Sequence, residues 1–251
     1  DAASSVISFF GVKLANQPAD REHPFGHGRM EYVSALAVAF LILQVGFSCF
    51  RSSFSKLLNP EEVTFSALSV GILCLSMGVK LWLSFFNRKL GNRIQSSVMK
   101  ASAADARGDV LITGATVLSI LIGKATGLKT DGFMGLIVSA VVLIAGIKIA
   151  KDTLEPLLGA AASREEYEKI TRKVQSYPGI VGSHDLIVHN YGPSRTMATI
   201  HAEVPNDIEL EKAHEIIDKI ERDVLREMGI FLVIHMDPVE VNDQKVVEKK
   251  M

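Results

Sequence analysis

Residues 96–123 read SSVMKASAADARGDVLITGATVLSILIG, a segment in which two carboxylates lead into an uncharged apolar run. The acids are Asp105 and Asp109, which are four residues apart, so a helix places both on one face. An ionisable residue at membrane depth is costly and is typical of an ion path or a proton relay. The alternative is an interfacial helix start with its acids in water, which the intervening Arg107 favours. The segment therefore predicts either a functional acid pair inside a membrane helix or a solvated helix end.

Three further apolar segments are long enough, or nearly so, to cross a bilayer. They are residues 32–50, residues 63–86 with Lys80 as an interruption, and residues 132–147. At about 1.5 Å per residue, helices of this length approach the thickness of a hydrocarbon core of roughly 30 Å. Residues 2–12 are apolar but short for a span, so we expect this segment to continue upstream of Asp1 and another helix to precede it.

Basic residues indicate how the helices are oriented. They cluster in the connection after residue 86 and at the exit of the last span, at Arg88, Lys89, Arg93, Lys100, Lys148 and Lys151. Because cytoplasmic loops carry an excess of Lys and Arg, we expect these connections and the following domain to be cytoplasmic. The net charge of −1 gives no reason to expect a nucleic-acid partner.

Beyond about residue 159, charged residues recur every few positions, which is typical of a soluble domain. The pattern predicts a helix over 163–176 capped by Ser163, strands over 183–190 and 196–204 around a turn at 191–194, a helix over 209–228 closed by Gly229, and a strand over 230–236. This order predicts an α+β module with its helices on one face of a small sheet. We therefore expect a transmembrane domain over 1–159, a cytoplasmic domain over 160–240 and a tail over 241–251.

All seven histidines lie outside the apolar spans, a distribution that favours metal handling. Imidazole suits Zn²⁺ and its neighbours, whereas carboxylates favour harder ions such as Mn²⁺. His235 and Asp237 share a strand face, and other histidines lie on neighbouring elements. We expect the following residues to converge on one or two divalent ions if the strand register allows it, with His189 as a bystander: His184, His201, His214, His235 and Asp237. Any one of these histidines alone would more often be an ordinary surface residue.

Several enzyme classes lack their signatures in this sequence. His214-Glu215 begins like a zinc-protease helix, but Asp218 stands where the second histidine would be. No Gly-x-Ser-x-Gly or phosphate-loop motif is present, which argues against a membrane hydrolase and an ATP-driven pump. We therefore expect a protein that is not an enzyme.

Taken together, these motifs resemble the cation diffusion facilitators, a family of proton-coupled exporters of divalent metal ions. The resemblance covers essentially the whole chain and is carried by PADREHPFGHGR at 18–29, DARGD at 105–109, GSHDL at 182–186, IH at 200–201, AH at 213–214 and IHMDP at 234–238. It implies a six-helix bundle, of which this chain lacks the first helix and the start of the second. It also implies a ferredoxin-like αββαβ cytoplasmic domain of the metallochaperone type and a bacterial inner-membrane location.

By this resemblance, Asp1, Asp105 and Asp109 belong to a four-ligand transport site whose remaining ligand lies upstream of Asp1. Zinc exporters of the family commonly carry histidine where Asp105 stands. A hard oxygen there tilts the preference toward Mn²⁺, with Zn²⁺ or Fe²⁺ as alternatives.

The resemblance implies two further metal sites. Asp20 and His27, with His23, match a loop metal site, for which a purely structural loop is the alternative. His184, His201, His214, His235 and Asp237 match a cytoplasmic cluster that holds two soluble domains together, with Asp237 as the bridging carboxylate.

The expected function is export of a divalent cation in exchange for protons, by alternating access in a homodimer formed through the cytoplasmic domain and the membrane helices. Metal bound at the cytoplasmic cluster would bias the conformational equilibrium. No organic cofactor is expected. The alternative is a membrane-anchored sensor of divalent metal that does not transport, which would not need acids at membrane depth.

Overall fold

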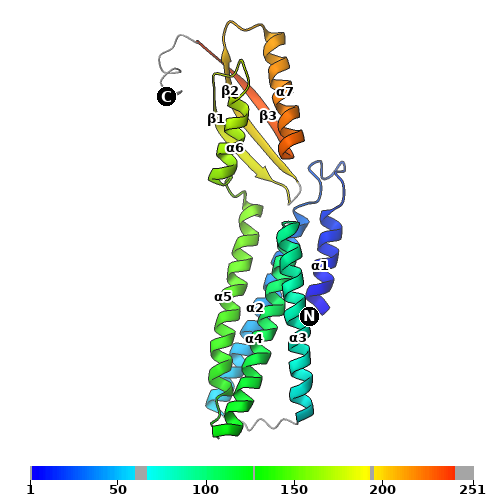
Figure 1. The fold of residues 1–251 in the computed structure, drawn as a ribbon, viewed down its shortest axis with the longest axis vertical. Helices are drawn as coiled ribbons and strands as arrows, with labels where there is room; N and C mark the ends of the chain where they lie inside the picture. The colour runs from blue at the N-terminus through cyan, green and yellow to red at the C-terminus, as the bar shows by residue number, and fades with distance from the viewer. Residues whose placement is uncertain (1, 60–66, 127, 193–194, 241–251) are drawn as a thin grey trace. The chain divides into compact units, whose positions relative to one another are not determined.

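The structure, a computed structural model, describes residues 2–59, 67–126, 128–192 and 195–240 (Figure 1). The chain divides into two compact units. The first comprises Asp1–Pro18 and Arg29–Leu157, and the second comprises Ala19–Gly28 and the chain from Leu158 onward. The short segment 19–28, which the sequence assigns to the transmembrane domain, thus packs as part of the second unit.

The first unit is a helical bundle, as the sequence predicts. Its helices are α1 (Ala2–Ala15), α2 (Met30–Leu58), α3 (Ala67–Arg93), α4 (Ser97–Thr126) and α5 (Asp131–Leu158). By length and composition, α2, α3, α4 and α5 are each able to cross a membrane. Residues 32–50 and 132–147 lie inside α2 and α5, and residues 96–123 lie inside α4 except for Ser96, which directly precedes it. Of the segment 63–86, residues 63–66 lie outside the described part of the chain.

Helix α4 is central to this unit because it contacts α1, α2 and α3. Ala35, Val38 and Ile42 of α2 form a buried core with Val98 and Ala101 of α4 and Val142 of α5. Helices α2 and α5 also approach closely through glycine: a Cβ added at Gly132 would lie 2.9 Å from the backbone nitrogen of Leu57. The acids carried by α4 are therefore held within a packed bundle.

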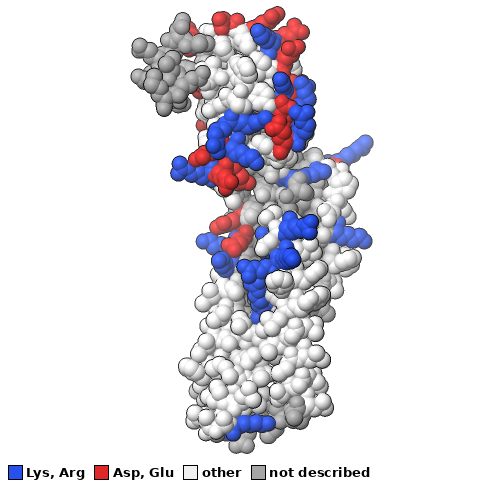
Figure 2. All heavy atoms as spheres, in the orientation of Figure 1, with Lys and Arg blue, Asp and Glu red and all other residues white. Residues whose placement is uncertain are grey.

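The outer surface of the helical unit is apolar. Large side chains point outward, among them Leu68 at 75% exposed and Phe85 at 68% exposed. Figure 2 shows a long stretch of the helices almost without charged side chains, bounded by basic residues. Such a surface suits hydrocarbon rather than water.

The second unit contains the predicted α+β module. Its elements are α6 (Arg164–Gln175), β1 (Gly182–Asn190), β2 (Thr196–Pro205), α7 (Leu210–Met228) and β3 (Ile230–Val239). The strands form one sheet in the order β1-β2-β3, with β1 antiparallel and β3 parallel to β2. The helix ends follow local sequence signals: Ser163 and Glu166 form a capping box at the start of α6, and Gly229 ends α7 with φ 68°. Pro193 and Ser194 of the predicted turn lie outside the described residues.

The two helices of this module cover one face of the sheet. Along β2, Ala198, Ile200, Ala202 and Val204 are buried against apolar residues of both helices. Because side chains alternate along a strand, the odd-numbered residues of β2, His201 among them, lie on the opposite face. That face carries His184, His201 and His235.

We predict that Tyr177→Phe weakens the module mainly near neutral pH. The Tyr177 hydroxyl donates to Asp223 Oδ2 at 2.7 Å, joining the segment after α6 to α7, and this hydrogen bond is the main cause that lowers the pKa of Asp223. A carboxyl with a lowered folded pKa adds stability above its unfolded pKa, and that stability is lost as the pH falls through the folded pKa. The loss of stability caused by Tyr177→Phe should therefore become smaller below about pH 4.

Thermal unfolding of the purified protein across this pH range measures the effect. Tyr167→Phe is the matched control, because Tyr167 is 42% exposed on α6. This variant should unfold at the wild-type temperature both at neutral pH and below about pH 4. A deficit for Tyr177→Phe that does not depend on pH would contradict the assigned role of Asp223.

Candidate metal sites

The predicted acid pair faces a cavity inside the helical unit. Asp105 and Asp109 are half-buried on α4 and line a cavity of about 420 Å³ between α1, α3 and α4. Several of the other lining side chains are polar: Ser4 and Ser5 of α1, Ser76, Lys80 and Asn87 of α3, and Ser102 of α4. Asp1, the third predicted ligand, lies outside the described residues. The arrangement places two carboxylates in a hollow that is lined by both polar and apolar side chains of the bundle.

A lysine neutralises one of these acids. Lys80 Nζ lies 2.8 Å from Asp109 Oδ2, and the two side chains are 23% and 20% exposed. Arg107, the basic residue between the acids in the sequence, instead donates from Nε to Ser84 Oγ at 3.1 Å. Sequence reasoning missed Lys80, which stood out only as a charge interrupting an apolar span. The residue that Lys80 contacts depends on how α3 packs against α4, and the sequence of α3 alone does not specify this packing.

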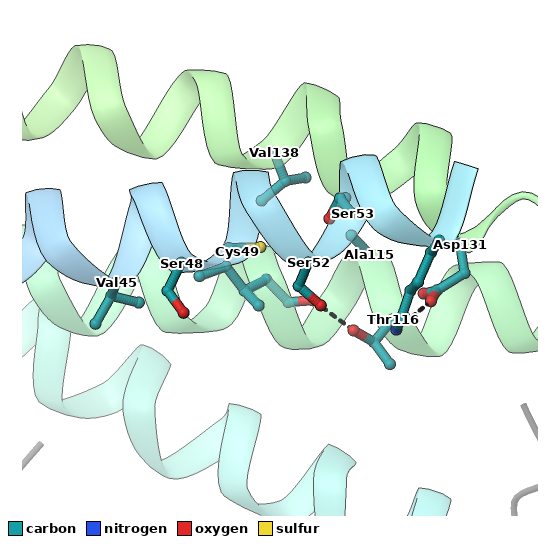
Figure 3. A pocket seen from close by; sticks show the side chains of 12 residues that line it. Val45, Ser48, Cys49, Ser52, Ser53, Ala115, Thr116, Asp131 and Val138 are labelled. Carbon is teal, nitrogen blue, oxygen red and sulfur yellow. Dashed lines mark hydrogen bonds and ion pairs between the residues drawn. The ribbon is translucent and has the colours of Figure 1, made fainter. Parts of the chain in front are cut away.

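A second cavity of about 380 Å³ lies between α2, α4 and α5. Figure 3 shows Ser52 and Thr116 turned toward each other across it, with Asp131 at one end. Asp131 accepts a hydrogen bond from Lys56 at 2.5 Å, which ties the start of α5 to α2. This ion pair was not predicted, and it belongs to a different cavity from that of the acid pair.

The loop residues Asp20, His23 and His27 come together within the second unit. Asp20 Oδ1 lies 3.4 Å from His23 Nδ1, Asp20 Oδ2 lies 3.6 Å from His27 Nε2, and the two imidazole rings are 4.4 Å apart. The His23 backbone N–H donates to Asp20 and, with the neighbouring imidazoles, lowers the pKa of that carboxyl despite partial desolvation. Their donor atoms lie within 4.8 Å of one another, so one carboxylate and two imidazoles face a common point.

In the sheet, three histidines form a row across the strands. His184 of β1 pairs with His201 of β2, which pairs with His235 of β3. The ring centroids are 5.2 Å apart for the first pair and 4.7 Å apart for the second. Asp237, two residues beyond His235, lies within reach of all three imidazoles: its Oδ2 is 2.9 Å from His201 Nδ1 and 3.2 Å from His184 Nε2, and its Oδ1 is 3.4 Å from His235 Nε2.

The row depends on a bulge in β1. The register shifts between His184 and Ile187, where one extra residue of β1 faces β2. Leu186 and Val188 pack toward the helices, so a regular strand would also turn His184 to the helix side. The extra residue brings His184 to the open face instead. Asp185 takes φ 51°, a left-handed conformation that aspartate tolerates better than most residues.

The donor set suits a divalent ion bound at Asp237. His184, His201 and Asp237 offer donor atoms within 4.8 Å of one another, and donors around a tetrahedral ion with bonds of about 2.1 Å stand roughly 3.4 Å apart. A hydrogen bond from His201, reinforced by the other imidazoles, lowers the pKa of Asp237, so the carboxylate is ready to bind. Its second oxygen faces His235, which leaves room for a bridging role.

Two predicted histidines stand apart from this group. His214 is exposed on α7 and is not among the described residues whose donor atoms gather at Asp237. His189, the expected bystander, pairs with Met197, about 13 Å along β2 from His201.

Sequence reasoning missed Glu203, whose Oε1 lies 3.1 Å from His184 Nδ1. Its signal was the two-residue spacing from His201, which puts both side chains on one strand face. A carboxylate in that position orients the imidazole so that its other nitrogen faces the metal position.

We predict that Asp185→Val weakens metal binding at this cluster by about tenfold or more, because a β-branched residue rarely takes a positive φ and the bulge that aims His184 would be lost. Asp185→Gly is the control, because glycine adopts this conformation readily and should keep the wild-type affinity. Titration of the purified protein with Zn²⁺, with His201→Ala to identify the signal of the cluster, measures the effect. Equal affinities of the Val and Gly variants would contradict a positioning role for the bulge.

Comparison with known proteins gives matches over both units. Residues 1–158 match the family model of the cation efflux transmembrane domain, and residues 162–239 match that of the cytoplasmic domain of cation efflux proteins. Cation-efflux pumps FieF of Yersinia enterocolitica and Klebsiella pneumoniae are each 30% identical to this chain over 242 residues, which is 96% of this chain and 80% of the relative. Two solved structures from work on the mode of action of CzrB, one of them a Zn form, are 27% and 26% identical over 31% of this chain, with TM-scores of 0.29 and 0.28.

Proposed function

This chain belongs to the cation efflux family, and from that premise we propose that it exports Mn²⁺ from the cytoplasm in exchange for protons, as a homodimer. Family membership itself means efflux of divalent metal cations by a multi-pass protein of the bacterial inner membrane with a cytoplasmic C-terminal domain. The choice of ion, the coupling to protons and the dimeric mechanism are the proposal. No organic cofactor enters it.

The observation that carries the proposal is the cavity lined by Asp105 and Asp109 inside the helical unit. A carboxylate binds a metal ion only when it is deprotonated, so protons and metal compete for the same oxygen lone pairs. Protons arriving from outside would displace the ion from these carboxylates. The protein would then return to its inward-facing state with Asp105 and Asp109 protonated. Asp1 is proposed as a third ligand of this site.

The donor chemistry supports Mn²⁺ over Zn²⁺. No imidazole or thiol is among the described residues that line the cavity of the acid pair, whereas carboxylates and hydroxyls are. Oxygen donors favour harder ions such as Mn²⁺, and imidazole or thiolate donors suit Zn²⁺. Zn²⁺ and Fe²⁺ remain the alternatives.

The two other clusters are proposed as resident metal sites. Asp20, His23 and His27 would form the loop site, and His184, His201, His235 and Asp237 would form the cytoplasmic site. His214 lies outside this group in the single chain, so its proposed role requires the second copy of a homodimer. Pairing of two cytoplasmic domains is supported by the match of residues 162–239 to the family's cytoplasmic domain. Metal bound there would bias the transporter toward one conformation.

We predict that Asp109→Asn lowers metal uptake by more than about tenfold, because it removes one charged ligand. Uptake is measured in proteoliposomes loaded with a fluorescent metal indicator under an imposed pH gradient. Asp131→Asn is the matched control: it removes a carboxylate that also pairs with a lysine in the helical unit but faces the other cavity, so it should keep uptake. Unchanged uptake by Asp109→Asn would contradict the proposed transport site, whereas absence of uptake by the wild type would favour a metal sensor over a transporter.

We predict that Asp105→His shifts selectivity from Mn²⁺ toward Zn²⁺, because it replaces a hard oxygen donor by a borderline nitrogen. The ratio of initial uptake rates for Mn²⁺ and Zn²⁺, compared between wild type and variant in the same assay, measures the shift. An unchanged ratio would remove the argument that Asp105 selects the ion.

A further inference from the structure

We propose that Lys80 is the resident counter-ion of the transport site: its ammonium group neutralises Asp109 while no metal is bound and leaves that carboxylate when the metal arrives. This inference rests on the proposed function of the acid pair. It adds to that function a residue that never binds metal and yet sets how tightly metal is held.

The geometry makes metal and ammonium competitors for Asp109. Lys80 Nζ lies 2.8 Å from Asp109 Oδ2, and both residues line the same cavity as Asp105. An ammonium group has donors but no acceptor, so Lys80 cannot join the ligand shell of a cation. A divalent ion bound to Asp109 would lie close to this ammonium group, and because two positive centres at that separation repel each other, binding of the ion drives the lysine away.

A counter-ion is needed because the site would otherwise hold bare carboxylates at membrane depth, which is costly. The side chains of Lys80 and Asp109 are only 23% and 20% exposed. Without the lysine, water would therefore only partly stabilise the negative charge of Asp109. Arg107 is hydrogen-bonded to Ser84. Among the described residues lining this cavity, Lys80 is the one that carries a positive charge.

Lysine is suited to this role because it can move. Its charge is compact and sits on a flexible four-carbon stem, whereas arginine is bound more rigidly by its planar fork. The cavity of about 420 Å³ also contains polar side chains along the same helix, at Ser76 one turn before Lys80 and Asn87 about two turns after it. These side chains offer positions to which the displaced ammonium can turn.

The experiment measures the KM for Mn²⁺, and separately for Zn²⁺, with the full chain in proteoliposomes. In the neutral variants Lys80→Met and Lys80→Gln the competitor is gone, so KM should fall about tenfold. Lys80→Arg keeps the charge and holds the carboxylate more rigidly, so KM should not fall below the wild-type value. The matched control is Lys56→Met, which removes the lysine paired with Asp131 in the other cavity of the helical unit (Figure 3) and should leave KM unchanged.

The outcomes separate this inference from the proposed function. An unchanged or raised KM in the neutral variants, or an equal fall in KM for Lys56→Met, overturns the role of Lys80. If Lys80→Met fails to fold, Lys80→Gln decides alone, because its amide still donates to Asp109 without carrying charge. Absence of uptake by the wild type, or full uptake by Asp109→Asn, refutes the transport site itself.

Discussion

The free-energy cost of a carboxylate inside an apolar helix bundle is the constraint on which the helical unit is organised. A carboxylate facing hydrocarbon is costly, and Asp105 and Asp109 instead face a cavity that α1, α3 and α4 line with hydroxyl groups and a lysine. The same cost makes the site responsive: a proton, an ammonium group or a divalent ion can each neutralise the acids. Transport as proposed is an exchange among these three, carried by helices whose outer surfaces suit lipid.

The soluble module meets a related requirement in water. Its apolar residues bind the sheet to two helices on one face, which frees the other face for polar side chains. Three imidazoles in one row would repel one another if all were protonated, and Asp237 within reach of all three offsets this. The cluster is thus built from side chains that strand pairing brings together, with one carboxylate as their common partner.

Local signals in the sequence predicted most of the elements and few of the contacts. Apolar run length predicted the long helices, and Ser163 and Gly229 marked helix ends because capping depends on neighbouring residues only. The partner of Lys80 depends on how α3 and α4 are rotated against each other, which no local pattern encodes. The sheet face on which His184 lies depends on a single extra residue in β1, because a shift of one residue moves the side chains of a strand to the opposite face.

The position of β3 has a consequence for the order in which this protein matures. His235 and Asp237 lie on the last strand of the module, which follows α7 in the chain and pairs in parallel with β2. Such non-local pairing forms late compared with hairpins and helices. A nascent chain that stops before β3 would hold His184 and His201 without the carboxylate they share. Occupancy of the cytoplasmic cluster would therefore report that synthesis and folding of the module are complete.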